Sequence, residues 1–556
     1  MYAFLITLIQ LSGGYLIFGC WLEEYEAIFQ NFFAGIYTEP PFELVYIDVY
    51  GGIIPLLCRL AEAAYPYPVN EYLQFAVVAA CCFVINYCAL NILAHTRASK
   101  VSFIITIGVL NLIVFPQFTV LLNCTRVSVL AGIAAFFAAS WFYMQGRKNL
   151  GGVLLVILLL TASSIERSFT AFFTTTLLLV LSFILWKLDF FKNRLGWIFI
   201  AFFFIQAGLI AGLLNYRAHS NHPAERYVMT YEYAVTNRGD LTPLPSGASR
   251  QDSIRYELLR NWLVTDTVAI NESYLRKFIR HVTVGDILSD KDYVAEQFGE
   301  AITLLTDFSR QYSYALIAII GFILIMPFRQ RIQGLSWAVI VMAMLMLLTI
   351  AGSMFHRAFA PFICLLASGL WVLWVLWSRQ SGLYRKNVLY LLLLFTIVAS
   401  FFSIRHLLEI RKENLRLHQA FRQFSQTALQ LDSLYPVMMQ SADMVMFAKK
   451  TFEKFPPRAE GNIIVLNAGY HSFFKFFNRP YREKYNLDIT NGQSVAGFIR
   501  SRNEKGVVLL TTSDGCKLFK DYLHAFFGLD IDVESLDVPP VESPQHTLYF
   551  FRIKAA

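Results

Sequence analysis

A carboxylate precedes a Gly-Gly turn in the first polar stretch of the chain, a setting that suits acid–base chemistry. Asp48 lies just before Gly51 and Gly52, and Glu39 and Glu43 lie earlier in the same stretch. A general base must sit on ordered backbone within reach of the proton that it removes. We therefore take Asp48 as the first candidate for a general base, with Glu43 and Glu39 as the next candidates. The alternative is that all three are solvated loop charges.

A second set of charged residues lies at the ends of long apolar segments, where it suits the binding of a phosphate. The set consists of Arg126, Arg167, Arg217, His356 and Arg357. The planar fork of donors on Arg binds phosphate oxygens in pairs. Charges this close to hydrocarbon are costly, so a functional role is the default hypothesis. The alternative is that they reach the membrane surface as snorkelling side chains or form ion pairs, such as Glu166 with Arg167.

Patterns for metal binding and disulfides are weak. His219 and His222 lie three residues apart, but Pro223 disfavours the regular helix that would bring them together, so we expect a solvated loop. No second His or Cys stands at ligand spacing from His356, and the Cys residues form no Cys-x-x-Cys pair. We predict no metal site and no required cofactor, with a divalent metal ion as an open alternative.

These residues must be positioned by a membrane domain. The chain is 56% hydrophobic and only 15% charged, whereas soluble proteins are about 25% charged. A spanning helix needs roughly 20 apolar residues. About eleven segments approach this length, and the predicted spans are 1–21, 72–94, 101–122, 126–145, 150–164, 168–187, 196–215, 312–328, 335–354, 358–377 and 387–404. The first has no basic start and is expected to be a retained helix.

Basic residues gather in every second connection between these segments, which indicates the orientation of the chain. Those connections carry Arg97, Lys100, Arg147, Lys148, Lys187, Lys192, Arg194, Arg329, Arg331, Arg379, Arg385 and Lys386, against the acid Asp189. Cytoplasmic loops are enriched in Lys and Arg. We therefore predict a cytoplasmic N-terminus, with the acidic connection 22–50 on the outer face. The net charge of +8 reflects this bias and does not indicate nucleic-acid binding.

The fold class predicted is an α-helical polytopic membrane protein with two long polar regions on its outer face. Residues 1–215 and 312–404 form the membrane bundle, and 51–64 form an interfacial helix, because this stretch is too short and too polar to span. Region 216–311 is mostly helical, with helical spacing over 253–264 and 274–284. Region 405–556 begins with an amphipathic helix and ends in a small α/β domain. Its predicted elements are a helix over 405–431, strands over 462–467, 506–512 and 547–553, and a helix over 516–527.

This arrangement resembles the GT-C superfamily of membrane glycosyltransferases, which use polyprenyl-phosphate sugar donors. The resemblance is topological and covers most of residues 1–404: an N-in first helix, an acidic outer loop, an interfacial helix and a bundle. Asp48 matches the acidic position of that family, with Glu43 or Glu39 next. The chain departs from the better-marked families because its first loop lacks an Asp-Asp or Asp-Glu pair. It also resembles uncharacterised polytopic membrane proteins of Bacteroidetes.

The resemblance implies a multi-pass protein of the bacterial inner membrane whose C-terminal domain is periplasmic. It implies a lipid-linked sugar donor, an envelope glycan or lipid as acceptor, and contact with membrane lipids. The donor phosphate would be held by Arg167 and Arg357, with His356, Arg126 and Arg217 as further candidates. Two alternatives stay open. One is a transporter, flippase or glycan polymerase with a path through the bundle, and the other is a non-catalytic scaffold.

Overall fold

The computed structural model describes most of the helices and the C-terminal sheet. The described residues are 1–22, 69–96, 98–146, 150–186, 189, 192–218, 241–261, 266, 268–281, 284–350, 355–381, 386–440, 464–465, 485–488, 491–542 and 546–556. The acidic candidates Asp48, Glu43 and Glu39 and the predicted interfacial helix 51–64 lie outside this part of the chain. The same is true of His219 and His222.

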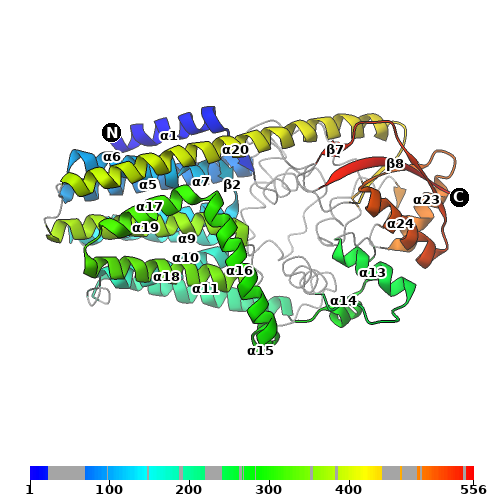
Figure 1. Ribbon diagram of the computed structural model, residues 1–556, viewed down its shortest axis with the longest axis horizontal. Helices are drawn as coiled ribbons and strands as arrows, with labels where there is room; N and C mark the ends of the chain where they lie inside the picture. Colours follow the sequence, from blue (N-terminus) through cyan, green and yellow to red (C-terminus); the bar gives the residue numbers. More distant parts are fainter. Residues whose placement is uncertain are drawn as a thin grey trace.

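The chain forms a bundle of apolar helices, seen at the left of Figure 1. Each of the segments predicted to span overlaps at least one helix. The bundle consists of α1 (Tyr2–Phe18), α5 (Val69–His95), α6 (Lys100–Gly108), the π-helix η2 (Val109–Val114), α7 (Pro116–Thr119), α8 (Cys124–Gln145), α9 (Leu150–Glu166), α10 (Ser168–Trp186), α11 (Arg194–Ala218), α17 (Ser313–Ile325), α18 (Phe328–Ile350), α19 (Phe355–Ser381) and α20 (Lys386–Asp432). Two-residue strands, β1 (Trp21–Leu22) and β2 (Leu121–Leu122), pair in parallel at one end of the bundle.

The length and hydropathy of these helices are compatible with a membrane protein. In the described part of the chain, 7 helices are long and apolar enough to cross a membrane, or up to 8 if one bent pair is a single span. Shorter apolar helices cover Tyr2–Phe18, Leu150–Glu166 and Phe359–Val375. The prediction of a helical protein with membrane-type helices is therefore confirmed, while the count of eleven spans stays a prediction.

Helix α8 lies at the centre of the bundle and packs against α5, α9, α10 and α19. Small residues allow this close packing of helices, because they let the backbones approach one another. In a membrane, such packing takes the place of the hydrophobic driving force that acts in water. A Cβ atom at Gly132 would lie 2.5 Å from Cγ2 of Thr174 on α10. Away from α8, the Asn86 amide donates to Thr7 at 2.9 Å and to Asn111 at 3.2 Å, which links α5 to α1 and η2.

Helix α20 connects the bundle to the C-terminal sheet. The predicted span 387–404 and the predicted helix 405–431 form one continuous helix of 47 residues. At about 1.5 Å per residue it is about 70 Å long, whereas the hydrocarbon core of a bilayer is about 30 Å thick. It therefore extends well past the bundle toward the sheet, as Figure 1 shows. We call the end of the bundle from which it leaves the domain-side end.

A six-stranded mixed sheet lies beyond this end. Its strand order is β4-β3-β5-β8-β6, with β7 paired to β8. Strand β5 is buried along its whole length, which explains its continuous apolar run. The predicted strands 506–512 and 547–553 contain β5 and most of β8, whereas the short strands β3, β6 and β7 were not predicted. The strands are β3 (Val437–Met439), β4 (Ile464–Val465), β5 (Val507–Thr511), β6 (Ile531–Ser535), β7 (Val541–Glu542) and β8 (Thr547–Ala555).

Two helices accompany the sheet, and four more precede α17. The helices beside the sheet are α23 (Gly492–Ser501) and α24 (Ser513–Phe527). The Thr512 side chain caps the start of α24, and Gly528 ends it at φ 57°. The helices that precede α17 are α13 (Arg250–Arg260), α14 (Glu272–Phe278), α15 (Val284–Ser289) and α16 (Lys291–Gln311). Helix α13 packs on α24, whereas α16 packs on α18 of the bundle. The region 216–311 thus contacts both the sheet domain and the bundle.

We expect the Gly132→Ala substitution to lower the free energy of unfolding by about 1–3 kcal/mol, because the added methyl overfills the contact with Thr174. Gly212→Ala on α11 is the matched control, since a Cβ there meets no atom within 4 Å. Thermal unfolding of the purified protein in detergent measures both. An equal effect of the two substitutions would contradict the close packing of α8 on α10.

Candidate functional site

Polar and charged side chains gather where α5, α8 and α9 end on the domain side. We call Gln74, Thr125, Arg126, Glu166 and Arg167 the arginine–glutamate cluster. Glu166 ends α9, Arg167 stands between α9 and α10, and Thr125 and Arg126 lie in the first turn of α8. Arg167 bonds Thr125, the chain neighbour of Arg126, so these two predicted residues lie at the same end of the bundle.

Arg126 is fixed by its surroundings and is only 2% exposed. Its backbone N–H donates to the Asn123 side chain at 2.6 Å, so Asn123 caps α8. Its guanidinium donates to the backbone oxygen of Gln117 at 2.7 Å. Tyr314 of α17 and His406 of α20 lie within electrostatic reach of the same guanidinium. Arg126 thus places a positive charge among α7, α8, α17 and α20.

Arg167 and Glu166 occupy the edge of the cluster. Nη1 of Arg167, which is half-buried, donates to the Thr125 hydroxyl at 2.7 Å. Nε2 of Gln74 donates to the carboxylate of Glu166 at 3.4 Å, and Glu166 is 6% exposed. Arg167 thus supplies a guanidinium group and its neighbour Glu166 a carboxylate, both at the junction of α9 and α10.

The scaffold behind the cluster is held by reciprocal hydrogen bonds between α8 and α9. The Ser128 hydroxyl donates to the backbone oxygen of Ser163, and the Ser163 hydroxyl donates to that of Ser128, both at 2.8 Å. From α11, the Gln206 amide donates to Ser164 at 2.8 Å. Hydroxyl and amide side chains commonly join helices in this way inside a membrane.

The other predicted phosphate-binding residues are located by their backbones alone. His356 and Arg357 lie in the first turn of α19, and Arg217 lies near the end of α11, but their side chains are outside the part that the structure describes. The start of α19 contacts Tyr312, whose ring centroid lies 5.7 Å from that of Phe359. Tyr312 also stacks edge-on with His406 at 5.2 Å.

The sequence analysis missed one buried acid near the cluster. Glu71 is 0% exposed and lies one turn before Gln74, on the same face of α5. The predicted span began at residue 72, so this carboxylate was treated as part of the preceding loop. An acid three residues before a Gln at the start of an apolar run is the signal that could have identified it.

Metal ligands and cysteine thiols are the other candidate chemical groups. Among them, no group of three or more His, Cys, Asp or Glu side chains is placed to hold a metal ion. The described Cys residues are all buried. In the sheet domain, burial raises the pKa of the Cys516 thiol to about 11, so this residue is a thiol and not a nucleophilic thiolate at neutral pH.

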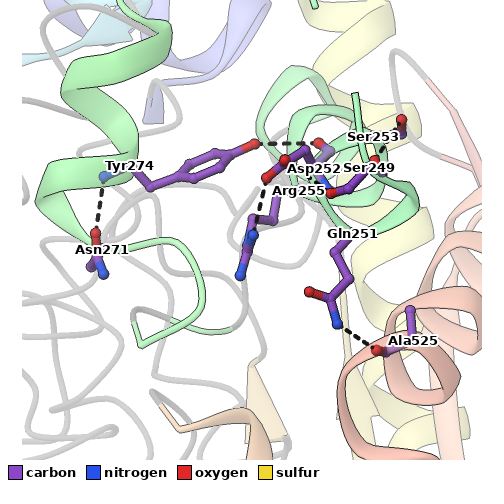
Figure 2. A network of polar contacts seen from close by, with 8 residues as sticks. All are labelled: Ser249, Gln251, Asp252, Ser253, Arg255, Asn271, Tyr274 and Ala525. Carbon is purple, nitrogen blue, oxygen red and sulfur yellow. Dashed lines mark hydrogen bonds and ion pairs between the residues drawn. The ribbon is translucent and has the colours of Figure 1, made fainter. Parts of the chain in front are cut away.

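A second polar network joins α13, α14 and α24 (Figure 2). The Ser249 hydroxyl donates to the Asp252 carboxylate at 2.9 Å, and Arg255 forms an ion pair with Asp252 at 3.1 Å. The hydrogen bond from Ser249 and the charge of Arg255 hold the pKa of Asp252 below its usual value. Burial raises the pKa of the Tyr274 phenol, so its hydroxyl stays protonated and donates to the Asp252 backbone.

This network docks region 216–311 onto the sheet domain. The Gln251 amide donates to the Ala525 backbone oxygen at 2.9 Å (Figure 2), and Arg250 forms an ion pair with Asp521 at 3.2 Å. The Tyr522 hydroxyl donates to the buried Asp266 carboxylate at 2.8 Å. The guanidinium of Arg255 lies 4.8 Å from the Phe526 ring centroid. These contacts are structural, since they join two folded units and leave no carboxylate aimed at open space among the residues drawn.

Chemically, the arginine–glutamate cluster is suited to an anion. The half-buried Arg167 guanidinium at this helix junction would interact with a negative charge more strongly than it would in bulk water. A phosphate oxygen would take hydrogen bonds from Arg in paired geometry. The cluster also supplies a carboxylate, Glu166, on the residue next to Arg167.

We expect alanine substitutions of Arg126 and Arg167 to differ in how much they lower the free energy of unfolding. Arg126→Ala leaves the backbone oxygen of Gln117 buried without this donor and should cost about 1–3 kcal/mol. Arg167→Ala, at a half-buried position, should cost about 1 kcal/mol or less. Thermal unfolding in detergent compares them. If Arg167→Ala destabilised the protein more than Arg126→Ala, the assignment of Arg126 as the fixed member would be wrong.

The Ser249→Ala variant should lose about 1 kcal/mol of stability at neutral pH, because the cap of α13 is removed. Part of this loss depends on pH. The folded-state pKa of Asp252 is lowered, so its contribution is present above the ordinary Asp pKa of about 4 and is lost as the pH falls through the folded value. The difference between the unfolding midpoints of the two proteins should therefore shrink as the pH falls from about 4 through the lowered folded pKa, while the part due to the helix cap remains. A constant difference would exclude the Ser249–Asp252 hydrogen bond as a contributor.

No family model matches this chain, and no curated protein or solved structure matches it either.

Proposed function

We propose that the protein is an integral membrane glycosyltransferase of the GT-C type, which uses a polyprenyl-phosphate-linked sugar at the outer leaflet of a bacterial inner membrane. The observation that carries this proposal is the position of Arg126 and Arg167 in one cluster at the domain-side end of the bundle. A lipid phosphate lies at this depth in a bilayer, between the hydrocarbon and the water. The product would be a modified envelope glycan or lipid.

The proposed reaction is a single displacement at the anomeric carbon. Asp48, or Glu43 or Glu39 in its place, removes the proton from an acceptor hydroxyl. The acceptor oxygen forms a bond to the anomeric carbon, and the bond between that carbon and the lipid-phosphate oxygen breaks. The lipid phosphate leaves as an anion, and the proton remains on the carboxylate. Arg167 and Arg357 stabilise the charge that develops on the leaving phosphate, with Arg126, Arg217 and His356 as further contributors.

The two polar regions have a role in this proposal. In the predicted topology of eleven spans, region 216–311 and the C-terminal α/β domain both lie on the outer face, so they are available to bind the acceptor. Support comes from their direct contact, because α13 packs on α24 and Tyr522 bonds Asp266. The long helix α20 contacts β3 and β7 of the sheet and so connects this docked pair to the bundle.

The proposal predicts that a deletion strain accumulates an unused lipid-linked sugar. Extraction of lipids followed by mass spectrometry would detect the donor, and complementation with the wild-type gene should remove it. Complementation with Asp48→Asn should fail if Asp48 is the base, with a loss of transfer of about 100-fold or more. Arg405→Ala is a control, since Arg405 is exposed and pairs only with its helix neighbour Glu409 among the interactions described for it.

Two results would contradict parts of this proposal. Full complementation by Asp48→Asn would exclude Asp48 as the base and leave Glu43 and Glu39 to be tested in the same way. An unchanged profile of lipid-linked sugars in the deletion strain would contradict the glycosyltransferase proposal itself. A changed distribution of a complete lipid-linked glycan across the membrane would instead favour the flippase or transporter alternative.

A further inference from the structure

Helix α16 differs from the helices of the bundle in its direction and in its surface. It meets the apolar helix α17 at a bend of 90°, with Tyr312 at the junction. Figure 1 shows α16 running across the domain-side end of the bundle, while α17 runs along it. If α17 crosses a membrane, α16 lies in the plane of that membrane, at the level where the bundle ends.

The side chains of α16 divide into three faces, because residues advance by about 100° each along a helix. Ala301 and Tyr293 form a face buried against the protein, at 0% and 5% exposure. Glu296, Glu300 and Asp307 form an exposed acidic face beside it. Phe298 and Ile302, which are each 46% exposed, form a third face on the side of the helix away from the acidic residues.

The exposed apolar face is continuous along the helix. Phe298 and Ile302 are four residues apart and therefore adjacent on its surface. Ala295, which is exposed, and Leu305, which is half-buried, extend the same stripe. Contact of this apolar stripe with water is unfavourable, and the acidic face is the side of the helix suited to water.

We infer that α16 lies in the membrane interface and that its Phe298–Ile302 face contacts the lipid acyl chains of the leaflet at the domain-side end. The direction of the helix in the membrane plane and its division into protein-facing, lipid-facing and water-facing sides carry this inference. Interfacial helices bury their apolar face about 5–10 Å into the boundary between headgroups and acyl chains. Tyr312, buried between α16 and α17, is of a residue type enriched at this level.

The acidic face also indicates how the helix binds. Interfacial helices that recognise anionic lipids carry Lys and Arg along their polar side. Here that side carries Glu296, Glu300 and Asp307, and the basic residues Lys291 and Arg310 lie near the ends. Binding therefore depends on apolar burial, and we expect it to be independent of the content of anionic lipid.

A fluorescent label on single cysteines tests this inference. The described native Cys residues are buried, so a Phe298→Cys substitution in a Cys58→Ser background provides an accessible thiol for a nitrobenzoxadiazole label. The protein is reconstituted in phosphatidylcholine nanodiscs, with or without lipid that is spin-labelled near the glycerol end of its acyl chain. Glu300→Cys, on the same helix but on the acidic face, is the matched control.

The label on the Phe298→Cys variant should be quenched about twofold more by the spin-labelled lipid than the label on the Glu300→Cys variant, and the order should reverse with aqueous iodide. Addition of phosphatidylglycerol should leave both values unchanged. If both labels were equally open to iodide, the face would be in water. If the Phe298→Cys label were shielded from both quenchers, protein would cover the face, for example a second copy of the chain. Either outcome overturns the inference, and Ile302→Cys repeats the test if Phe298→Cys does not elute as the wild-type protein does.

Discussion

Burial of the Arg126 guanidinium constrains the domain-side end of the bundle. A charge at this depth is stable only if the surrounding helices supply acceptors for it. The backbone oxygen of Gln117 is one such acceptor, and it is available because α7 is a single turn that starts at Pro116. The position of Arg126 therefore depends on the break between η2 and α8, and the neighbouring Thr125 in turn orients Arg167.

The same end of the bundle is where the rest of the protein converges. Helix α20 leaves it toward the sheet, and Arg411 on α20 donates to the backbone oxygen of Ile17 at the end of α1. Region 216–311 returns to it through α16. Beyond the bundle, a Cβ atom at Gly492 would collide with the Tyr522 hydroxyl and the Asp266 carboxylate, so only Gly permits this buried contact. The bundle and the two polar regions thus contact one another through α16, α20 and the packing of α13 on α24.

Hydropathy was sufficient to predict the bundle, because a run of apolar residues has few alternatives to a helix in a membrane. It was also sufficient for β5 and β8, whose apolar runs are long. It was insufficient for β6, where Asp532 and Glu534 are exposed at an edge strand, and for β3, which has only three residues. Helix α16 was not predicted as an amphipathic element, because its apolar residues are divided between a buried face and the exposed Phe298–Ile302 face.

The candidate site was only partly predictable for a similar reason. Arg126 and Arg167 stood out as charges inside apolar sequence, but sequence spacing does not bring α8 and the α9–α10 junction together. Gln74 and Thr125 carry no charge and gave no signal. Glu71 is charged, but it was placed in the loop before the helix because the predicted span began at residue 72, whereas α5 begins at Val69. Contacts between helices distant in sequence determine which of these residues share a site.

The central claim is that the arginine–glutamate cluster binds the phosphate of a lipid carrier. Native mass spectrometry of the purified protein with a polyprenyl phosphate measures this directly. We predict a bound lipid whose dissociation constant rises about tenfold or more in Arg167→Ala, which corresponds to about 1.4 kcal/mol, and is unchanged in Arg405→Ala. Equal binding by the wild-type protein and Arg167→Ala, or binding of the dephosphorylated polyprenol with the same affinity, would contradict it.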